Sequence, residues 1–253
     1  MPFADTSSHE EYTAAVERVA GRALGVLMDT EGSVVPTGCA TDPSHIDPAA
    51  GGSRDRGADP DADLPGLRVL GSDMLAPHVL RGTPLPADQA EAAARAFTVF
   101  PPETLGTSAD TAWILTWRDW ATARTLTRFG LSVDVPVPGD GAQVADATTW
   151  QAWSVRMAQL SPLALPGLDG PIHAAARRNA DSLARGTVRA MLRRDYRTAA
   201  RIARWLAFVR ADGVTYPLDL APLLRHIRVF GGGSTRTVLD TRIAQHVTGL
   251  EGS

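Results

Sequence analysis

Residues 171–210 read PIHAAARRNADSLARGTVRAMLRRDYRTAARIARWLAFVR, and this stretch decides the fold class. Arginines recur along it at the three- and four-residue spacings of a helix face, as Arg178, Arg185, Arg189, Arg193, Arg197, Arg201 and Arg204. The opposite face is apolar and carries Ala176, Leu183, Met191, Ile202, Leu206 and Val209. This periodicity predicts two amphipathic helices, over residues 171–194 and 196–210.

Similar patterns predict helices on both sides of this pair. They cover residues 8–24, 87–99, 108–129, 146–160, 220–229 and 235–248. Short apolar or alternating runs predict strands at 26–28, 33–35, 67–70, 78–80 and 131–138. The sum is an α+β fold that is predominantly α-helical, with a small N-terminal strand region packed against a C-terminal helical bundle.

The chain of 253 residues divides by composition into three parts. Residues 1–39 hold a helix and a hairpin, and residues 66–253 form the mainly helical body. Between them, residues 40–65 are acidic, rich in proline and glycine and poor in large apolar side chains. We expect a mobile loop there, and one compact domain made of the two other parts.

Composition excludes several enzyme classes. All 25 basic residues are arginine, so no lysine is present to form a Schiff base with pyridoxal phosphate or to serve as a P-loop lysine. The absence of lysine, with a single asparagine, is typical of a GC-rich bacterial genome. Cys39 is the single cysteine and no two of the six histidines are four residues apart, so we expect no metal site and no cofactor.

Neither a membrane nor a secretory pathway is indicated. No apolar run is long enough to span a bilayer, and the first residues, MPFADTSSHEEY, lack the apolar core of a signal peptide. With one cysteine and no disulfide, we expect a cytoplasmic protein.

Charge is distributed unevenly along the chain. Residues 1–170 contain 11 arginines and 22 acids, whereas residues 171–253 contain 14 arginines and 6 acids. The arginine helices could present Arg185, Arg189, Arg193 and Arg197 to an acidic protein partner. They could equally be a solvated face, or dock on the acidic part of the same chain. The sequence pI near 6.1 argues against nucleic acid.

The segment FGGGSTRTVLD, residues 230–240, is the first candidate site. Three glycines precede Ser234 at the start of a predicted helix, where free amides attract anions. Arg225, Arg228 and Arg236 could grip a sulfate, phosphate or carboxylate, and His226 could exchange a proton with it. The simpler interpretation is a flexible turn in which Ser234 only caps the helix.

Two carboxylates and one tryptophan complete the candidates. Trp113, Trp117 and Trp120 follow helical spacing, which favours a core role, although Trp117 could also wall a ligand pocket. Asp119 beside them, in an apolar setting, could transfer protons. Asp134 lies in the predicted strand opposite its apolar face, as an exposed residue or as a general base.

Two functions follow from these features. The first is an enzyme of bacterial small-molecule metabolism, which includes specialised metabolism. It would bind an anionic small molecule through arginines and use a carboxylate or histidine for acid–base chemistry. Its substrate could be held on an acidic carrier protein. The alternative is a non-enzymatic interaction or regulatory protein that binds an acidic protein or nucleic acid through the arginine helices.

Overall fold

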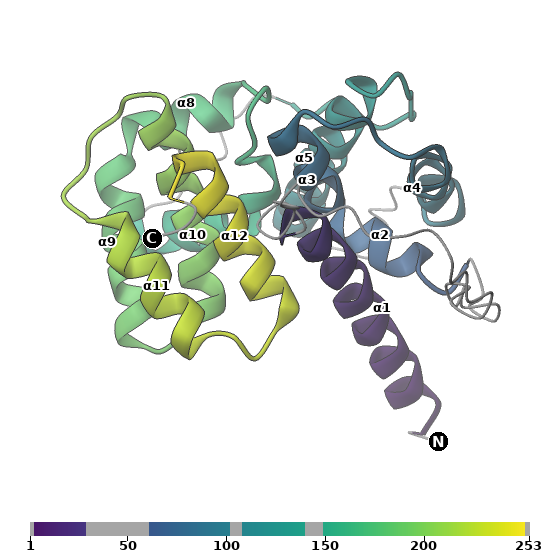
Figure 1. The fold of residues 1–253 in the computed structure, drawn as a ribbon, viewed down its shortest axis with the longest axis horizontal. Helices are drawn as coiled ribbons and strands as arrows, with labels where there is room; N and C mark the ends of the chain where they lie inside the picture. The colour runs from purple at the N-terminus through teal and green to yellow at the C-terminus, as the bar shows by residue number, and fades with distance from the viewer. Residues whose placement is uncertain (1–2, 29–60, 102–107, 140–148, 251–253) are drawn as a thin grey trace, which may run out of the picture.

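The protein is helical throughout the part of the chain that its computed structural model describes, residues 3–28, 61–101, 108–139 and 149–250 (Figure 1). Within these ranges lie eleven α-helices and one short 3-10 helix, and no strand. The predicted α+β class with an N-terminal strand region is therefore wrong, and the predominantly helical character is confirmed.

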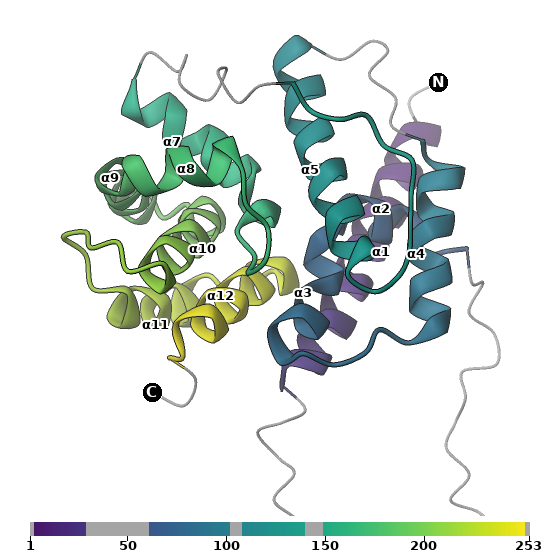
Figure 2. The same ribbon diagram turned by 90° about the horizontal axis from the view of Figure 1, so that it is seen from above.

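The helices form two groups that lie side by side (Figure 2). The first group consists of α1 (Phe3–Met28), α2 (Leu64–Leu70), α3 (Ser72–Arg81), α4 (Ala87–Val99) and α5 (Ala109–Thr127). The second consists of α7 (Trp150–Gln159), η1 (Ser161–Leu163), α8 (Pro171–Arg178), α9 (Ala180–Leu192), α10 (Tyr196–Ala211), α11 (Leu220–Phe230) and α12 (Thr235–Thr248). One continuous set of buried apolar side chains runs through both groups.

Helix α10 is the centre of the second group. Residues 202–209 are all buried, which is typical of a helix surrounded by other helices. Its neighbours α7, α9, α11 and α12 cover it on different sides. The indole of Trp205, which is fully buried, donates from Nε1 to the carbonyl oxygen of Met157 at 2.8 Å and so ties α10 to α7.

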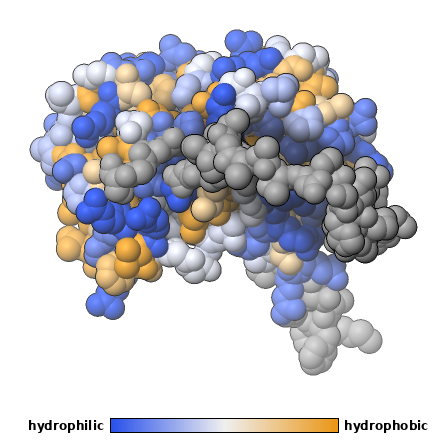
Figure 3. All heavy atoms as spheres, in the orientation of Figure 1, coloured by the Kyte–Doolittle hydropathy of each residue, from blue (hydrophilic) through white to orange (hydrophobic). Residues whose placement is uncertain are grey.

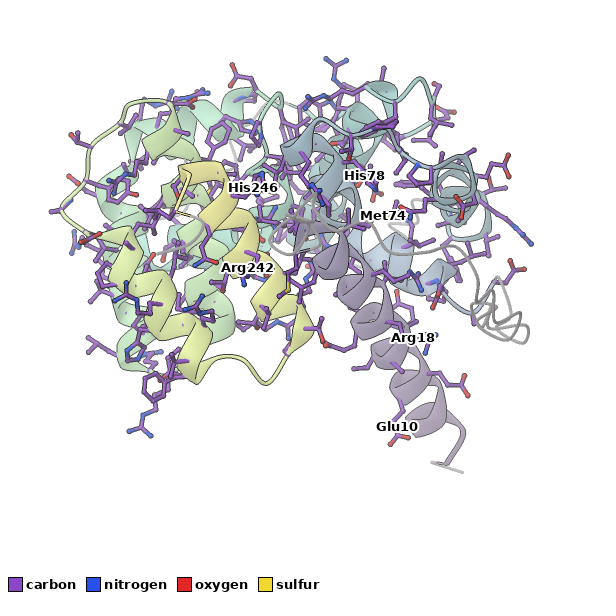
Figure 4. All side chains as sticks on the ribbon, in the orientation of Figure 1. Glu10, Arg18, Met74, His78, Arg242 and His246 are labelled. Carbon is purple, nitrogen blue, oxygen red and sulfur yellow. The ribbon has the colours of Figure 1, made fainter. Side chains whose placement is uncertain are left out.

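Helices α1 and α3 join the two groups. α1 packs against α2 and α3 of its own group and against α12 of the other. A Cβ at Gly66 would lie 2.5 Å from the carbonyl oxygen of Ala15, so the crossing of α1 and α2 requires a glycine. α3, which carries Met74 and His78 (Figure 4), contacts α1, α5, α12 and η1. This central position of α3 brings its first turn to the boundary between the groups.

Most helix predictions are confirmed. The predicted helices at 87–99 and 235–248 coincide with α4 and α12, and 108–129, 146–160, 196–210 and 220–229 differ from α5, α7, α10 and α11 by four residues or fewer at either end. Helix α1 extends beyond the predicted 8–24 at both ends. The predicted helix at 171–194 is instead two helices, because Asn179 interrupts it between α8 and α9.

Three predicted strands are helical. Residues 26–28 end α1, where Leu27 continues the buried stripe of Val19, Ala20 and Ala23 at helical spacing. Residues 67–70 belong to α2 and residues 78–80 to α3. Short apolar runs do not distinguish a strand from a buried helix by periodicity, and here packing against α1 decided the outcome.

The predicted strand at 131–138 shows the expected alternation only as far as residue 135, since Val137 is 86% exposed, and it has no partner strand among the described residues. Leu131 and Val133 pack against the core while Asp134 is exposed, as a strand would place them. Residues 131–139 nevertheless form no ladder with any described segment, so they cross the core surface as a single extended stretch.

Several predictions fall on residues outside the described ranges. These are the strand at 33–35, Cys39 and most of the 40–65 loop, of which 61–65 is described and leads into α2. None of the described helices is both long enough and apolar enough to cross a lipid bilayer.

Candidate functional site

A buried cluster of charged side chains joins the two groups of helices. Arg204 of α10 donates from Nη1 to Asp73 Oδ1 of α3 at 2.6 Å and to Asp240 Oδ1 of α12 at 2.7 Å. Arg236 of α12 donates from Nη2 to the other carboxylate oxygen of Asp73 at 2.7 Å. Asp73, Arg204 and Asp240 are each 1% exposed, so these ion pairs are shielded from water.

Two further arginines lie at the edge of this cluster. Arg201, one turn before Arg204, approaches Asp240 with a distance of 3.7 Å from Nε to Oδ2. Arg118 of α5 donates from Nη2 to the carbonyl oxygen of Val69, and no carboxylate among the described residues forms an ion pair with it. At this boundary between the two groups of helices, the cluster contains four guanidinium groups and two carboxylates. Among the described residues it therefore has an excess of two positive charges. Its members are Arg118, Arg201, Arg204, Arg236, Asp73 and Asp240.

The ionisation of the cluster reflects this excess. Burial, and after it the neighbouring Arg236, lowers the pKa of Arg118 to about 10. Burial also lowers the pKa of Arg201, where Asp240 opposes the shift and Arg236 adds to it. Arg118 and Arg201 both lie close to the guanidinium group of Arg236, so like charges are held close together. Such an arrangement is stabilised by an anion.

A cavity of about 200 Å³ opens onto these charges. Arg118, Arg201 and Arg236 reach it from three different helices, and Ser161 and Gln159 add polar groups from η1 and the end of α7. We call this cavity the arginine pocket. The Nε atoms of all three arginines and the Oγ atom of Ser161 are buried and have no hydrogen-bond partner in the described part of the protein. Asp240 Oδ2, 3.7 Å from Arg201 Nε, is a buried acceptor that likewise has no hydrogen-bond partner, so the unpartnered donors around the pocket outnumber this acceptor.

A second cavity, of about 220 Å³, adjoins the arginine pocket. Both are lined by Leu115, Arg118 and Pro162, so Arg118 stands at their common boundary. The second cavity also carries Tyr12 and Phe100 and we call it the aromatic pocket.

A larger and mostly apolar cavity, of about 400 Å³, lies within the first group of helices. Val19, Met74 and Leu75 line it, with Arg22 and Asp63 among its polar residues, which pair with each other at 2.6 Å. Its buried histidine, His78, has Nδ1 3.2 Å from the hydroxyl oxygen of Thr83. Arg22, Asp63 and His78 of this cavity thus have internal partners, unlike the Nε atoms of the arginines that line the arginine pocket.

Of the arginines predicted around the glycine turn, the structure brings only Arg236 to the arginine pocket. Arg225, His226 and Arg228 lie on α11 with exposed side chains, and the ring of His226 packs 4.5 Å from that of Phe230. The residues of the predicted cluster are therefore separated: three lie on the exposed surface of α11, and Arg236 lies between the two groups of helices.

The start of α12, predicted as the anion site, is already in contact with a carboxylate of the protein. Glu17 of α1 accepts from the Thr235 amide at 2.8 Å and from the Ser234 hydroxyl at 3.1 Å. Burial would raise the pKa of Glu17, but these hydrogen bonds outweigh it and hold the pKa below the ordinary value. A Cβ at Gly231 would lie 2.7 Å from Tyr196 Cβ, which gives this glycine a packing role.

Trp117 and Asp119 are buried, and Trp113 and Trp120 beside them are partly buried. Trp117 is 4% exposed and meets Trp113 and Trp120 edge to face, as the core interpretation predicted. Asp119 lines the aromatic pocket, where both of its carboxylate oxygens accept from Arg68, at 2.5 and 2.7 Å. Asp134 is exposed and lines none of these three cavities.

The predicted arginine face divides along its length. Arg178, Arg185, Arg193 and Arg197 are exposed and Arg189 is half-buried, whereas Arg204 is fully buried. No ion pair links Arg185, Arg189, Arg193 or Arg197 to another described residue, although the Arg185 guanidinium lies 4.5 Å above the Trp150 ring. Figure 3 shows polar and apolar residues intermixed over α9 and α11, the helices beside this face.

Sequence reasoning missed the residues that build the boundary. Asp73 belonged to no candidate motif, and Asp240 ended the 230–240 segment without being assigned a role. Arg204 belonged to the arginine face, for which a solvated surface, a partner interface and docking on the acidic part of the chain were all left open. The one available signal was a charged residue on the apolar side of a helix, since Asp240 lies beside the buried Leu239 and Ile243. In the described ranges, no group of three or more histidine, cysteine or acidic side chains is arranged to hold a metal ion.

Comparison of the chain with protein-family models, with curated proteins and with solved structures found no match. The geometry of the two adjoining pockets is therefore the basis on which a function is proposed.

Proposed function

We propose that the protein binds a small anionic molecule in the arginine pocket. The observation that carries this proposal is the excess of two positive charges around a cavity lined by Arg118, Arg201 and Arg236. A partly dehydrated guanidinium group is costly without a counter-charge, and a phosphate, sulfate or carboxylate would supply one. Arginine also binds such groups through two parallel hydrogen bonds.

The arginine pocket suits this role better than the start of α12. At the helix start, Glu17 already accepts the hydrogen bonds that an external anion would need. At the arginine pocket, Asp73 and Asp240 compensate only part of the charge. Binding there would also bridge the two groups of helices, because the three arginines come from α5, α10 and α12.

We propose further that the bound molecule is a substrate, so that the protein is an enzyme of bacterial small-molecule metabolism in the cytoplasm. Asp119 is the candidate acid–base group closest to this site, since it lines the adjoining aromatic pocket. Its bidentate contact with Arg68 would have to open for it to accept a proton. His226 and Asp134 lie outside both pockets.

One observation favours the alternative of an interaction protein. The exposed arginines Arg185, Arg193 and Arg197 have no ion-pair partner among the described residues, so an acidic protein surface could pair with them. A solvated face has the same appearance, which leaves this proposal second to the arginine pocket.

Thermal unfolding with added phosphate tests the proposed site. A ligand that binds the folded state stabilises it by RT ln(1 + [L]/Kd), or about 2.7 kcal/mol at a hundredfold excess over Kd. We expect phosphate to stabilise the wild type, and to stabilise Arg201→Gln much less. Arg197→Gln, one turn earlier on α10 and exposed, is the matched control and should behave as the wild type.

Phosphate and sulfate also stabilise proteins by exclusion from their surface, so the comparison between variants carries the result. Equal stabilisation of the wild type and Arg201→Gln at every concentration would contradict binding at the arginine pocket.

A further inference from the structure

We infer that the ligand is a phosphate monoester with a cyclic, aromatic organic part, whose phosphate lies in the arginine pocket and whose ring lies in the aromatic pocket. This inference rests on the proposed function and narrows the ligand to one chemical class. Charge, donor arrangement and the shape of the two adjoining cavities support it.

The charge of the arginine pocket fits a dianion. Arg204 is neutralised by Asp73 and Asp240, which it contacts at 2.6 and 2.7 Å. Arg236 shares Asp73, Arg201 is 3.7 Å from Asp240, and Arg118 pairs with no described carboxylate. Two positive charges remain, whereas a carboxylate or a sulfate ester brings only one negative charge. A phosphate monoester carries close to two at neutral pH, because its second pKa is about 6.

The donors also surround the cavity, as a tetrahedral anion requires. Three guanidinium groups approach from α5, α10 and α12, and Ser161 and Gln159 contribute from the intervening chain. A flat carboxylate presents two oxygens to such a ring of donors, whereas a phosphate presents three outside its ester bond. The unpartnered Oγ atom of Ser161 is the additional donor that a third oxygen would accept from.

The adjoining aromatic pocket has the opposite character. Its two charged groups besides Arg118, Arg68 and Asp119, neutralise one another through a bidentate pair. Arg68 also donates from Nε to the carbonyl oxygen of Phe100 at 2.8 Å, which fixes the end of α4 beside the cavity. A pocket with balanced charge and a fixed wall suits the uncharged part of a ligand.

Aromatic side chains at this pocket favour a ring. Tyr12 and Phe100 both line the cavity and are 43% and 37% exposed, so part of each side chain can contact a ligand. Stacking of rings adds to apolar burial in such pockets. Since Arg118 lines both cavities, one ligand can place its phosphate on one side of Arg118 and its ring on the other.

Calorimetric titration with phenyl phosphate, phenyl sulfate and inorganic phosphate at constant ionic strength tests the inference. We expect phenyl phosphate to bind about tenfold more tightly than inorganic phosphate, because its ring gains contacts worth a few apolar carbons. Phenyl sulfate should bind about tenfold more weakly than phenyl phosphate. Affinity for phenyl phosphate should fall as the pH is lowered below about 6, where the ester loses its second charge.

Two variants of exposed aromatic residues locate the ring. Tyr12→Ser should reduce the affinity for phenyl phosphate towards that for inorganic phosphate and leave the latter unchanged. Phe230→Ala, in which an aromatic ring that is 61% exposed on α11 is removed, is the control and should change neither affinity. Circular dichroism of both variants verifies that their helices are intact.

The outcomes separate the inference from the proposed function. If inorganic phosphate binds in an Arg201-dependent way but phenyl phosphate binds no more tightly, or Tyr12→Ser has no effect, the inference is overturned and the proposed function stands. If phenyl sulfate binds as well as phenyl phosphate, the dianion argument is overturned. If none of the three ligands binds, both proposals fail.

Discussion

Arg197 and Arg204 lie two turns apart on one face of the same helix, α10. Arg197 is exposed to solvent, whereas Arg204 is buried, with only 1% of its surface exposed. Arg201, between them, is intermediate. The difference arises outside α10, because α12 packs against α10 and presents Asp240 to Arg204, and Asp73 of α3 reaches the same guanidinium group. Helical periodicity identifies a face of a helix, whereas the neighbouring elements decide whether that face meets water.

Substitution of the buried arginine should have the largest effect on stability. Arg204→Met leaves Asp73 and Asp240 buried without their main cation, and breaking a buried pair in this way costs about 3–5 kcal/mol. Arg197→Met should change the free energy of unfolding by less than about 0.5 kcal/mol, as is usual for exposed positions. Urea denaturation of both variants measures the difference. If both variants had the same free energy of unfolding, the ion pairs of Arg204 would contribute no more to stability than the exposed side chain of Arg197.

The buried carboxylate of Asp73 should make the stability of the protein depend on pH in acid. Burial would raise the pKa of Asp73, but Arg204 and Arg236 outweigh it and hold the folded-state pKa below its ordinary value of 3.8. The unfolded chain therefore binds this proton more readily. The stability due to Asp73 is present above about pH 4 and is lost as the pH falls through the folded-state value.

The measurement is the slope of the free energy of unfolding against pH between about pH 4 and pH 2. We expect Asp73→Asn to be less stable at neutral pH and to have a smaller slope than the wild type. A slope that Asp73→Asn does not reduce would argue against a charged Asp73 in the folded protein.

The smallest effect is expected at the exposed end of the arginine face. The double variant Arg189→Ala with Arg193→Ala should change stability by less than about 1 kcal/mol, because neither side chain has an ion-pair partner among the described residues. If the face binds an acidic protein, the same variant should weaken that binding and reduce its salt dependence. Binding whose salt dependence the double variant does not alter would exclude this face as the interface.

The sequence predicted which segments are helical better than it predicted which side chains are buried. Helices with long periodic stripes were found where expected. Ser234, considered as the cap of the last helix, instead donates its hydroxyl hydrogen to Glu17 and makes no side-chain capping hydrogen bond. The strands at 67–70 and 78–80 were wrong because runs of three or four residues carry too little periodicity to identify an element. These segments are helical in the structure, where α2 packs against α1, and α3 packs against α1 and α5.

The candidate site depended on contacts that are far apart in the chain. Asp73 meets Arg204 across 131 residues and Arg236 across 163. Local patterns identified Arg236 and Asp119 as candidates. They also grouped Arg236 with Arg225 and Arg228, which lie exposed on α11 and do not line the arginine pocket. Glu17, which binds the start of α12, comes from the opposite end of the chain and no local motif could reveal it.

The central claim is that the uncompensated charge of Arg118, Arg201 and Arg236 forms a binding site, whereas the exposed arginines of α9 and α10 do not form one. A crystal structure of the protein soaked with tungstate, a tetrahedral dianion with strong anomalous scattering, tests it most directly. We predict one dominant anomalous peak in the arginine pocket, with tungstate oxygens about 2.7–3.1 Å from the guanidinium nitrogens of Arg118, Arg201 and Arg236. Dominant peaks beside Arg193 or Arg197 and none in the arginine pocket would contradict the claim.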